Sequence, residues 1–143
     1  MALGKIKADT LEHSTAGSLD TQFVVNGSLK QWINMDGSGT ISVRDSLNNT
    51  SITDNGTGYY SLNFSSSAAN INYSISGGTN GSNNSFPNAA TASGNIRFNT
   101  NTGSPYKAQP TTSAFNMTIT QDQSLATAVD VEWANANIHG DLA

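Results

Sequence analysis

The stretch SITDNGTGYYSLNF, residues 51–64, decides the fold. Its last six residues alternate polar side chains with the apolar Tyr60, Leu62 and Phe64. A period of two residues is typical of a β-strand that has one buried and one solvated face. Residues 55–58, NGTG, precede this strand, and Asn and Gly supply the positive φ angles of a tight turn. The stretch therefore predicts a β-hairpin.

Two ligand-binding alternatives for DNGTG, residues 54–58, fit less well than a turn. A calcium loop needs several oxygen ligands and a bidentate acid, whereas this segment offers one carboxylate, Asp54. A phosphate cradle leads into a helix N-terminus and usually includes a lysine, whereas this segment leads into a strand. We expect DGSG, residues 36–39, to form a second turn of the same kind.

Strand-like alternation recurs along most of the chain beyond residue 20. No window of ten or more residues has a convincing helical stripe, and Gly, Asn, Asp or Ser bound most of the apolar runs. This pattern predicts an all-β fold, either an antiparallel β-sandwich or a small jelly-roll-like barrel, preceded by a short extended N-terminal arm. Besides the hairpin, strands are expected at residues 21–25, 29–35, 40–45, 71–76, 95–99, 114–120 and 128–133.

The N-terminal residues differ from the rest of the chain. Residues 1–25 have sparse apolar positions, of which Ile6, Leu11 and Leu19 are the candidates for anchoring, and they cannot bury much surface alone. Such an arm would be ordered only by docking on its own domain, on a neighbouring copy or on another protein; a frayed tail is the alternative. We therefore predict an anchoring or assembly arm at residues 1–25 and a β-sandwich domain at 26–143.

Composition excludes several classes of function. The chain has 143 residues, of which 36% are hydrophobic and 11% are charged, with a net charge of -4. Its 6 Lys and Arg residues form no cluster, so no nucleic-acid partner is expected. No apolar run approaches about 18 residues, so no membrane insertion is expected. Cysteine is absent, so stability must come from sheets, packing and subunit contacts.

Residues for catalysis are few. His13 and His139 lie near opposite ends of the chain, and no Ser nucleophile motif accompanies them. Asp130 and Glu132 flank Val131, so strand alternation would place both acids on one solvated face. We predict no catalytic residues, no metal site and no cofactor. A polysaccharide-degrading enzyme is the least favoured alternative, because it needs two converging acids.

Aromatic residues in polar loops are the candidates for ligand binding. The long polar stretch at residues 77–94 is too hydrophilic for the core, and long loops in compact domains often carry function. An exposed ring among amides can stack on a sugar, but it can equally pin its own loop to the domain. Trp32 and Trp133 lie within strand patterns and are expected in the core or at a subunit interface. The candidate ligand-binding residues are Asn80, Asn83, Asn84, Phe86 and Tyr106.

A series of motifs carries a resemblance to a known group of proteins. IKADTLEHSTAG (6–17), VNGS (25–28), QWINMDGSGT (31–40) and SITDNGTGYYSLNF (51–64) follow one another, and Gly140-Asp141 stands near the end. Together they resemble the short fibre or appendage proteins of marine and cyanobacterial tailed phages. The motifs are distinctive as a series, although each alone is weak. Residues 77–113 have no counterpart in the resemblance.

The resemblance implies a structural component of the virion. Such a protein would be a homotrimeric tail-fibre or tail-tip appendage that contributes to attachment to host-surface carbohydrate. Its arm would contact other tail or capsid proteins, and it would be assembled in the host cytoplasm and exposed on the particle surface. A capsid decoration protein with a purely structural role is the alternative.

Overall fold

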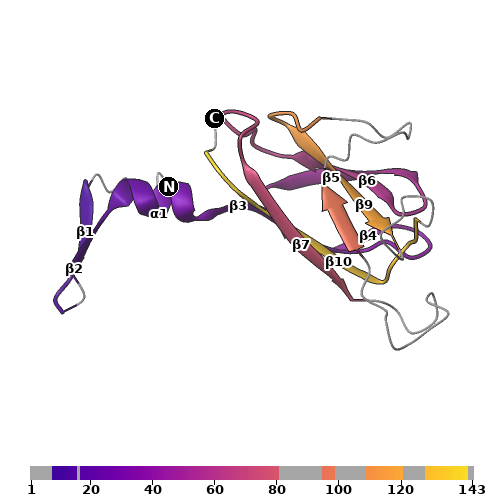
Figure 1. Cartoon of the computed structure of the whole chain (residues 1–143), viewed down its shortest axis with the longest axis horizontal. Helices are drawn as coiled ribbons and strands as arrows, with labels where there is room; N and C mark the ends of the chain where they lie inside the picture. The colour runs from indigo at the N-terminus through magenta and orange to yellow at the C-terminus, as the bar shows by residue number, and fades with distance from the viewer. Residues whose placement is uncertain (1–7, 16, 81–94, 99–108, 121–127, 142–143) are drawn as a thin grey trace, which may run out of the picture.

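Two four-stranded antiparallel sheets face each other across an apolar core in the computed structural model (Figure 1). The structure describes residues 8–15, 17–80, 95–98, 109–120 and 128–141. Among the described strands, none pairs with a strand of the opposite sheet, so the layers form a sandwich and not a closed barrel. The predicted all-β sandwich is therefore confirmed.

Each sheet combines strands from distant parts of the chain. The first sheet has the strand order β4-β3-β10-β7, and the second has the order β5-β6-β9-β8. The first sheet consists of β3 (Leu29–Asp36), β4 (Ser42–Leu47), β7 (Ser74–Asn80) and β10 (Trp133–His139). The second consists of β5 (Asn49–Gly56), β6 (Tyr59–Phe64), β8 (Asn95–Phe98) and β9 (Ala114–Thr120).

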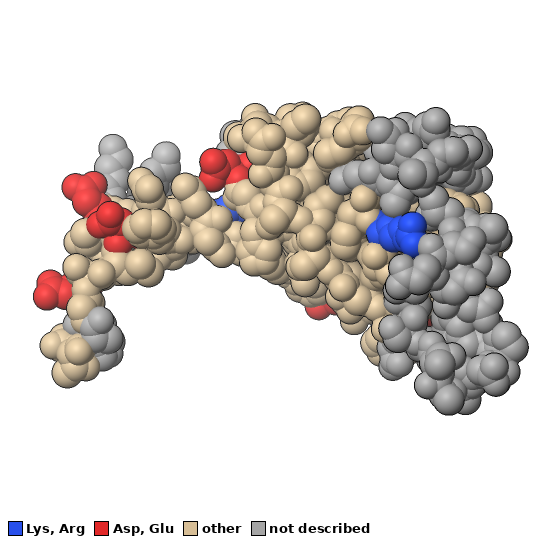
Figure 2. All heavy atoms as spheres, viewed as in Figure 1, with Lys and Arg blue, Asp and Glu red and all other residues tan. Residues whose placement is uncertain are grey.

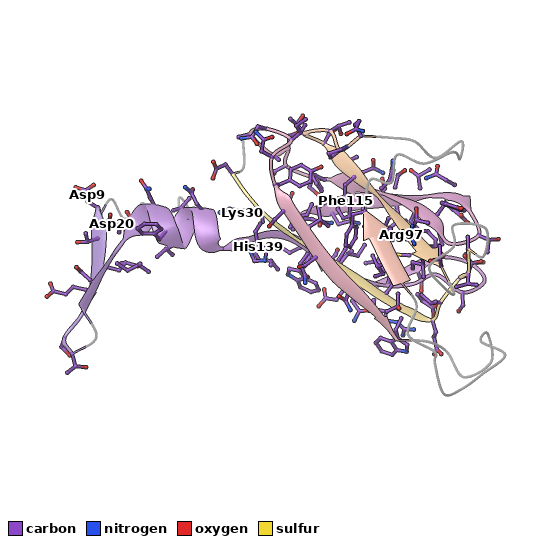
Figure 3. The ribbon with its side chains drawn as sticks, viewed as in Figure 1. Asp9, Asp20, Lys30, Arg97, Phe115 and His139 are labelled. Carbon is purple, nitrogen blue, oxygen red and sulfur yellow. The ribbon has the colours of Figure 1, made fainter. Side chains whose placement is uncertain are left out.

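Alternating apolar residues from both sheets form the core. Figure 3 labels Phe115 of β9 in the interior of the sandwich, where its ring centroid lies 5.9 Å from those of Phe64 and Phe98. Burial of one large apolar side chain stabilises a fold by about 1.5–3 kcal/mol. The fully buried apolar residues come from four strands and one loop: Ile33, Met35, Tyr60, Leu62, Phe115, Met117, Ile119, Val131, Ala134, Ala136 and Ile138.

The hairpin that decides the fold has the predicted form. Strands β5 and β6 pair antiparallel; β5 ends at Gly56 (φ 128°), and the turn that follows contains Gly58 (φ 69°). The Asp54 carboxylate accepts the Gly56 N–H at 2.9 Å, which closes the turn from within. A Cβ at Gly58 would lie 2.5 Å from the carbonyl oxygen of Ile119. DNGTG is therefore a tight turn packed beneath β9.

The arm, residues 8–28, has secondary structure of its own and projects from one end of the sandwich (Figure 1). Strands β1 (Thr10–His13) and β2 (Gly17–Asp20) form a two-stranded hairpin, followed by helix α1 (Thr21–Gly27). The helix extends two residues past the predicted end of the arm at residue 25, and β3 begins at Leu29.

The expected strand at residues 21–25 is wrong, because this segment forms helix α1. Its apolar residues are consecutive and not alternating, so no register gives it one polar face. Thr21 also starts the helix locally: its N–H donates to the Asp9 carbonyl at 2.8 Å and its hydroxyl to the Ala8 carbonyl at 2.7 Å. The Ser28 N–H donates to the Val24 carbonyl and closes the other end.

β4 begins at Ser42 and not at residue 40, and two further expected strands also begin later than predicted. β10 begins at Trp133, so residues 128–133 are not a continuous strand, although Val131 is fully buried. β7 begins at Ser74, and Ile71, expected on the buried face with Tyr73, is half exposed. In both cases the chain makes loop contacts before it joins the sheet, which alternation alone does not reveal.

Candidate binding surfaces

The arm exposes nearly all of its large apolar side chains. Leu11 and Leu19 are directly opposite each other in the β1–β2 register, so they lie on the same face of the hairpin, and both are about half exposed. In α1, Phe23 is 58% exposed and Val25 is 59% exposed, and Val24 is also exposed. No residue of α1 is buried. An exposed apolar surface of this kind is typical of interaction sites.

The apolar residues of α1 point in several directions. Successive residues of a helix are rotated by about 100°, so Phe23, Val24 and Val25 spread over about 200° of its circumference. A single flat partner cannot cover such a spread. These three side chains can all be buried only if other elements pack against the helix from more than one side.

The described part of the arm is acidic as well as apolar. Figure 2 shows acidic side chains along it, and its described acidic residues are Asp9, Glu12 and Asp20. No Lys or Arg occurs within residues 8–28. The first basic residue of the sandwich, Lys30, donates to the Val25 carbonyl and to the Ser28 hydroxyl. This cation lies at the C-terminal end of α1, where the helix dipole favours positive charge.

A second surface is the outer face of sheet β4-β3-β10-β7, which we call the tryptophan face. In β3, Gln31, Ile33 and Met35 are buried, so Trp32 and Asn34 point outward. In β10, Ala134, Ala136 and Ile138 are buried, so the outer face receives Trp133, Asn135 and Asn137. We define the tryptophan face by Trp32, Asn34, Trp133, Asn135 and Asn137.

Strand register places these residues in rows across the sheet. Trp32 is paired with Leu47 on one side and Asn137 on the other. The next row contains Asp45, Asn34 and Asn135. Trp133 is four residues from Asn137 along β10, which at about 3.3 Å per residue corresponds to about 13 Å. An amide row therefore separates the two tryptophan positions.

The amides of this face make few hydrogen bonds among the described residues. Among the described residues, the side chains of Asn34 and Asn137 have no hydrogen-bond partner. Asn135 accepts only the backbone N–H of Gly78, at 3.1 Å. Each free amide group offers two N–H donors and one carbonyl acceptor.

Arg44 orders one of the two indoles. Its guanidinium carbon lies 3.8 Å from the centroid of the Trp133 ring, and it donates to the Asp36 carboxylate and to the Glu132 carbonyl at 2.9 and 3.0 Å. Hydrogen bonds from the Ser38 hydroxyl and N–H, with a smaller contribution from Arg44, hold the pKa of Asp36 below its ordinary value of 3.8. Trp133 is nevertheless 41% exposed.

The outer face of the second sheet differs, because its polar side chains satisfy one another. Asn55 donates to the Ser61 hydroxyl at 2.8 Å, and Ser61 donates to the Asn116 carbonyl oxygen at 2.7 Å. On a neighbouring row, Asn63 donates to the Ser51 hydroxyl at 3.1 Å. The polar side chains of this face therefore hydrogen-bond to one another, whereas Asn34 and Asn137 on the tryptophan face have no partner among the described residues.

Asp130 contributes to the structure of the sandwich. One Asp130 oxygen accepts both the Tyr60 hydroxyl and the Gly58 N–H at 2.7 Å. Burial, followed by this bond to Asp130, raises the pKa of Tyr60. Asp130 and Glu132 therefore do not form the solvated pair that alternation predicts, because Asp130 lies against Tyr60 while Glu132 is exposed.

An open groove lies between β4 and β5. It has a volume of about 470 Å³ and is lined by Gly39, Thr40, Ile41, Val43, Ile52 and Asp54. Its one carboxylate among these described residues, Asp54, already accepts the Gly56 N–H in the turn. The described lining of the groove therefore contains no pair of acids.

The structure places the sequence-predicted residues unequally. Leu11 and Leu19 are brought together on the arm, as a cross-strand pair. Asn80 ends β7 opposite Trp133, next to the tryptophan face. Ile6, Asn83, Asn84, Phe86 and Tyr106 lie outside the described residues.

The two tryptophans were not among the candidate ligand-binding residues. They were expected in the core or at a subunit interface, and the structure rules out the core, because both lie on an outer sheet face. A signal was present in QWINM, residues 31–35, because burying Ile33 and Met35 forces Trp32 outward. His139 is the last residue of β10, and Figure 3 places it with Lys30 at the end of the sandwich nearest the arm.

Comparison with known proteins yields no match: no family model, no curated protein and no solved structure is similar to this chain. Within the part of the chain that the structure describes, no group of three or more His, Asp or Glu residues is placed to hold a metal ion. The same residues include no helix with the length and apolar character needed to span a membrane.

Proposed function

We propose that this chain is a homotrimeric appendage protein of a tailed-phage virion, anchored by its arm and contributing to attachment to host-surface carbohydrate. The observation that carries the proposal is the arm itself, which holds five large apolar residues in contact with solvent. The motif series, which resembles that of phage appendage proteins, supplies the biological setting.

The arm is unsuited to exist alone. A two-stranded hairpin is marginally stable in water, and a helix of seven residues is well below the length at which isolated helices persist. Its order must come from packing against other chains. Two neighbouring arms around a three-fold axis would enclose α1 from two sides, which matches the spread of Phe23, Val24 and Val25.

The sandwich is suited to display. Its surface is rich in Ser, Thr and Asn, and its core is closed without cysteine. A neutral, hydroxylated surface remains soluble outside the cell, and a sandwich of paired strands is independent of redox conditions.

A capsid decoration protein is the second candidate. The observation that favours it is the flat tryptophan face with exposed Leu47 beside it, because tryptophan is enriched at protein interfaces. In this alternative the face packs against the shell and does not meet a host glycan.

The oligomeric state tests the assembly half of the proposal. Light scattering of the full chain should give three times the chain mass of 14.9 kDa. Phe23→Asp and Val25→Asp should reduce it to one chain, because a charge would be buried between arms. Ile71→Asp is the matched control, since Ile71 is equally exposed but lies in the sandwich. A monomeric wild-type chain at micromolar concentration would contradict the trimer.

Position on the particle tests the virion half. Labelling of intact virions with an antibody against the sandwich, followed by electron microscopy, should mark the tail or its tip. Dense labelling of the shell would select the decoration protein, and absence from purified particles would reject both.

A further inference from the structure

We propose that the tryptophan face is a binding platform for a neutral, extended oligosaccharide, which would lie across β3 and β10. This inference rests on the proposed function for the source of the glycan, the host surface. Its chemistry rests on three features of the face: two indoles, three amides of which Asn34 and Asn137 have no partner among the described residues, and an Arg44 charge that is already paired with Asp36.

The indoles set the length of the ligand. Trp32, which is half-buried, and Trp133, which is exposed, lie on one face, and the strand rise between their rows amounts to about 13 Å. A sugar ring stacks its C–H face on an indole, so two indoles at this spacing suit a chain of several sugars and not a monosaccharide. Because both residues stand on paired strands, the platform exists before the ligand arrives, which limits the entropy lost on binding.

The amides supply recognition of hydroxyl groups. Asn34 and Asn135 form the row between the two indoles, and Asn137 lies beside Trp32. An amide can both donate to and accept from a sugar hydroxyl. Gly78 is paired with Asn135 on the neighbouring strand β7, and it has no side chain that could cover the Asn135 amide. The contrast with the second sheet is informative, because there the same residue types are engaged with one another.

The charges favour an uncharged ligand. Arg44 is paired with Asp36 and stacked on Trp133, so its charge is compensated within the protein. Asp45 lies in the same row as Asn34 and adds a negative charge at the edge of the face. A uronic-acid polymer would meet this carboxylate without an uncompensated cation among the residues that define the face.

Titration of the full chain with purified polysaccharides tests the inference. The probes are a β-glucan, a mannan and a galactan, with alginate as the acidic comparison, and the readouts are tryptophan fluorescence and affinity electrophoresis. We expect binding to at least one neutral polymer and at least tenfold weaker binding to alginate. Binding to alginate alone, or to none of the four, overturns the proposal.

Variants then locate the site. Trp133→Ala and Trp32→Ala should each weaken binding at least tenfold, and Trp133→Tyr should retain most of it because a ring remains. Asn63→Ala, on the outer face of the second sheet, is the control and should bind normally. Unchanged binding in both Trp→Ala variants overturns the proposal.

Mass measurement separates this inference from the proposed function. The Trp133→Ala protein should keep the wild-type mass, and Phe23→Asp should lose the trimer while its sandwich still binds the polysaccharide. If Trp133→Ala dissociates the trimer, the face is a subunit contact and the inference fails. If the protein is a trimer on the virion but binds no neutral polymer, only the inference fails.

Discussion

The Asp130 carboxylate accepts the Tyr60 hydroxyl and the Gly58 N–H through one oxygen, at 2.7 Å in each case. A loop residue just before β10 thus fastens the turn between β5 and β6 to a tyrosine of the core. The bond links segments about seventy residues apart along the chain. It gives Asp130 a structural role where a solvated acid was expected.

Removal of this carboxylate should destabilise the sandwich. Asp130→Ala leaves the Gly58 N–H without its side-chain acceptor and leaves the buried Tyr60 hydroxyl only the longer bond to the Gly37 carbonyl, at 3.3 Å, which should cost about 1–3 kcal/mol. Denaturant unfolding followed by circular dichroism measures the change. Glu132→Ala is the control, because that exposed side chain should change stability by less than about 0.5 kcal/mol. Equal effects of the two substitutions would refute the role of Asp130.

Two glycines with similar backbone angles should respond differently to alanine. At Gly39 (φ 64°), no atom of the described residues lies within 4 Å of the position that a Cβ would occupy, so Gly39→Ala should cost only backbone strain, about 1–2 kcal/mol. Gly58 (φ 69°) would place its Cβ 2.5 Å from the Ile119 carbonyl oxygen. Gly58→Ala should therefore lower the melting temperature clearly more than Gly39→Ala, and a smaller effect would contradict the packing of this turn.

Alkaline pH should unfold the protein as its buried tyrosines ionise. Burial raises the pKa of Tyr73 from 10.0 to about 12, and the pKa of Tyr60 is raised further in the same direction. A raised folded-state pKa means that this stability is complete below pH 10 and is lost as the pH rises toward 12. The urea concentration at the midpoint of unfolding, measured between pH 8 and 12, should therefore decrease as the pH rises from 10 to 12. Tyr73→Phe should flatten part of the fall, since Phe does not titrate.

Acidic pH should weaken the contact between Arg44 and Trp133, because it protonates Asp36, the carboxylate to which Arg44 donates. The pKa of Asp36 is held below 3.8 by Ser38 and Arg44, so its stabilising contribution is complete above pH 3.8 and is lost as the pH falls through the lower folded value. Tryptophan emission of Trp32→Phe, in which Trp133 is the remaining indole, should shift in that acid range before the sandwich unfolds. Asp36→Asn should abolish the shift.

Gln31 should be replaceable with a gain in stability. It is 1% exposed, and neither of its amide atoms has a hydrogen-bond partner among the described residues. Gln31→Met keeps the shape and removes two buried polar atoms, so thermal unfolding should show stabilisation of about 1–2 kcal/mol. Gln31→Ala should be destabilising, because it opens a cavity. A destabilised Gln31→Met protein would show that a water satisfies the amide in the adjoining space of about 10 Å³.

Periodicity predicted the sandwich because its main strands follow a two-residue repeat. Ile33 and Met35 in β3 and Phe115 and Met117 in β9 are buried as alternation requires. The repeat failed at Phe23, Val24 and Val25, whose aromatic and β-branched character favours a strand although these residues form a helix. Thr21, the first residue of the helix, is held there by its hydrogen bonds to the carbonyls of Ala8 and Asp9, which precede β1.

The tryptophan face could be predicted only in part. Alternation in β3 assigns Trp32 to the side opposite Ile33, but the sequence does not show which strands lie beside it. The row that joins Trp32 to Asn137 depends on the pairing of β3 with β10, which are separated by about a hundred residues. Registers of that range follow from the whole fold and not from any local motif.

A single residue, Ser28, separates the end of α1 at Gly27 from the start of β3 at Leu29. In the proposed trimer, the three sandwiches would have no long linker to their helices. Association of the helices would therefore also hold the three sandwiches close together. Three glycan platforms held at fixed separation would act as one multivalent surface, and avidity of this kind can exceed single-site affinity by about 10²–10⁴-fold. Weak binding by each sandwich would then be enough to hold a particle. Because any single sandwich could still dissociate and rebind, the particle could move along the host surface.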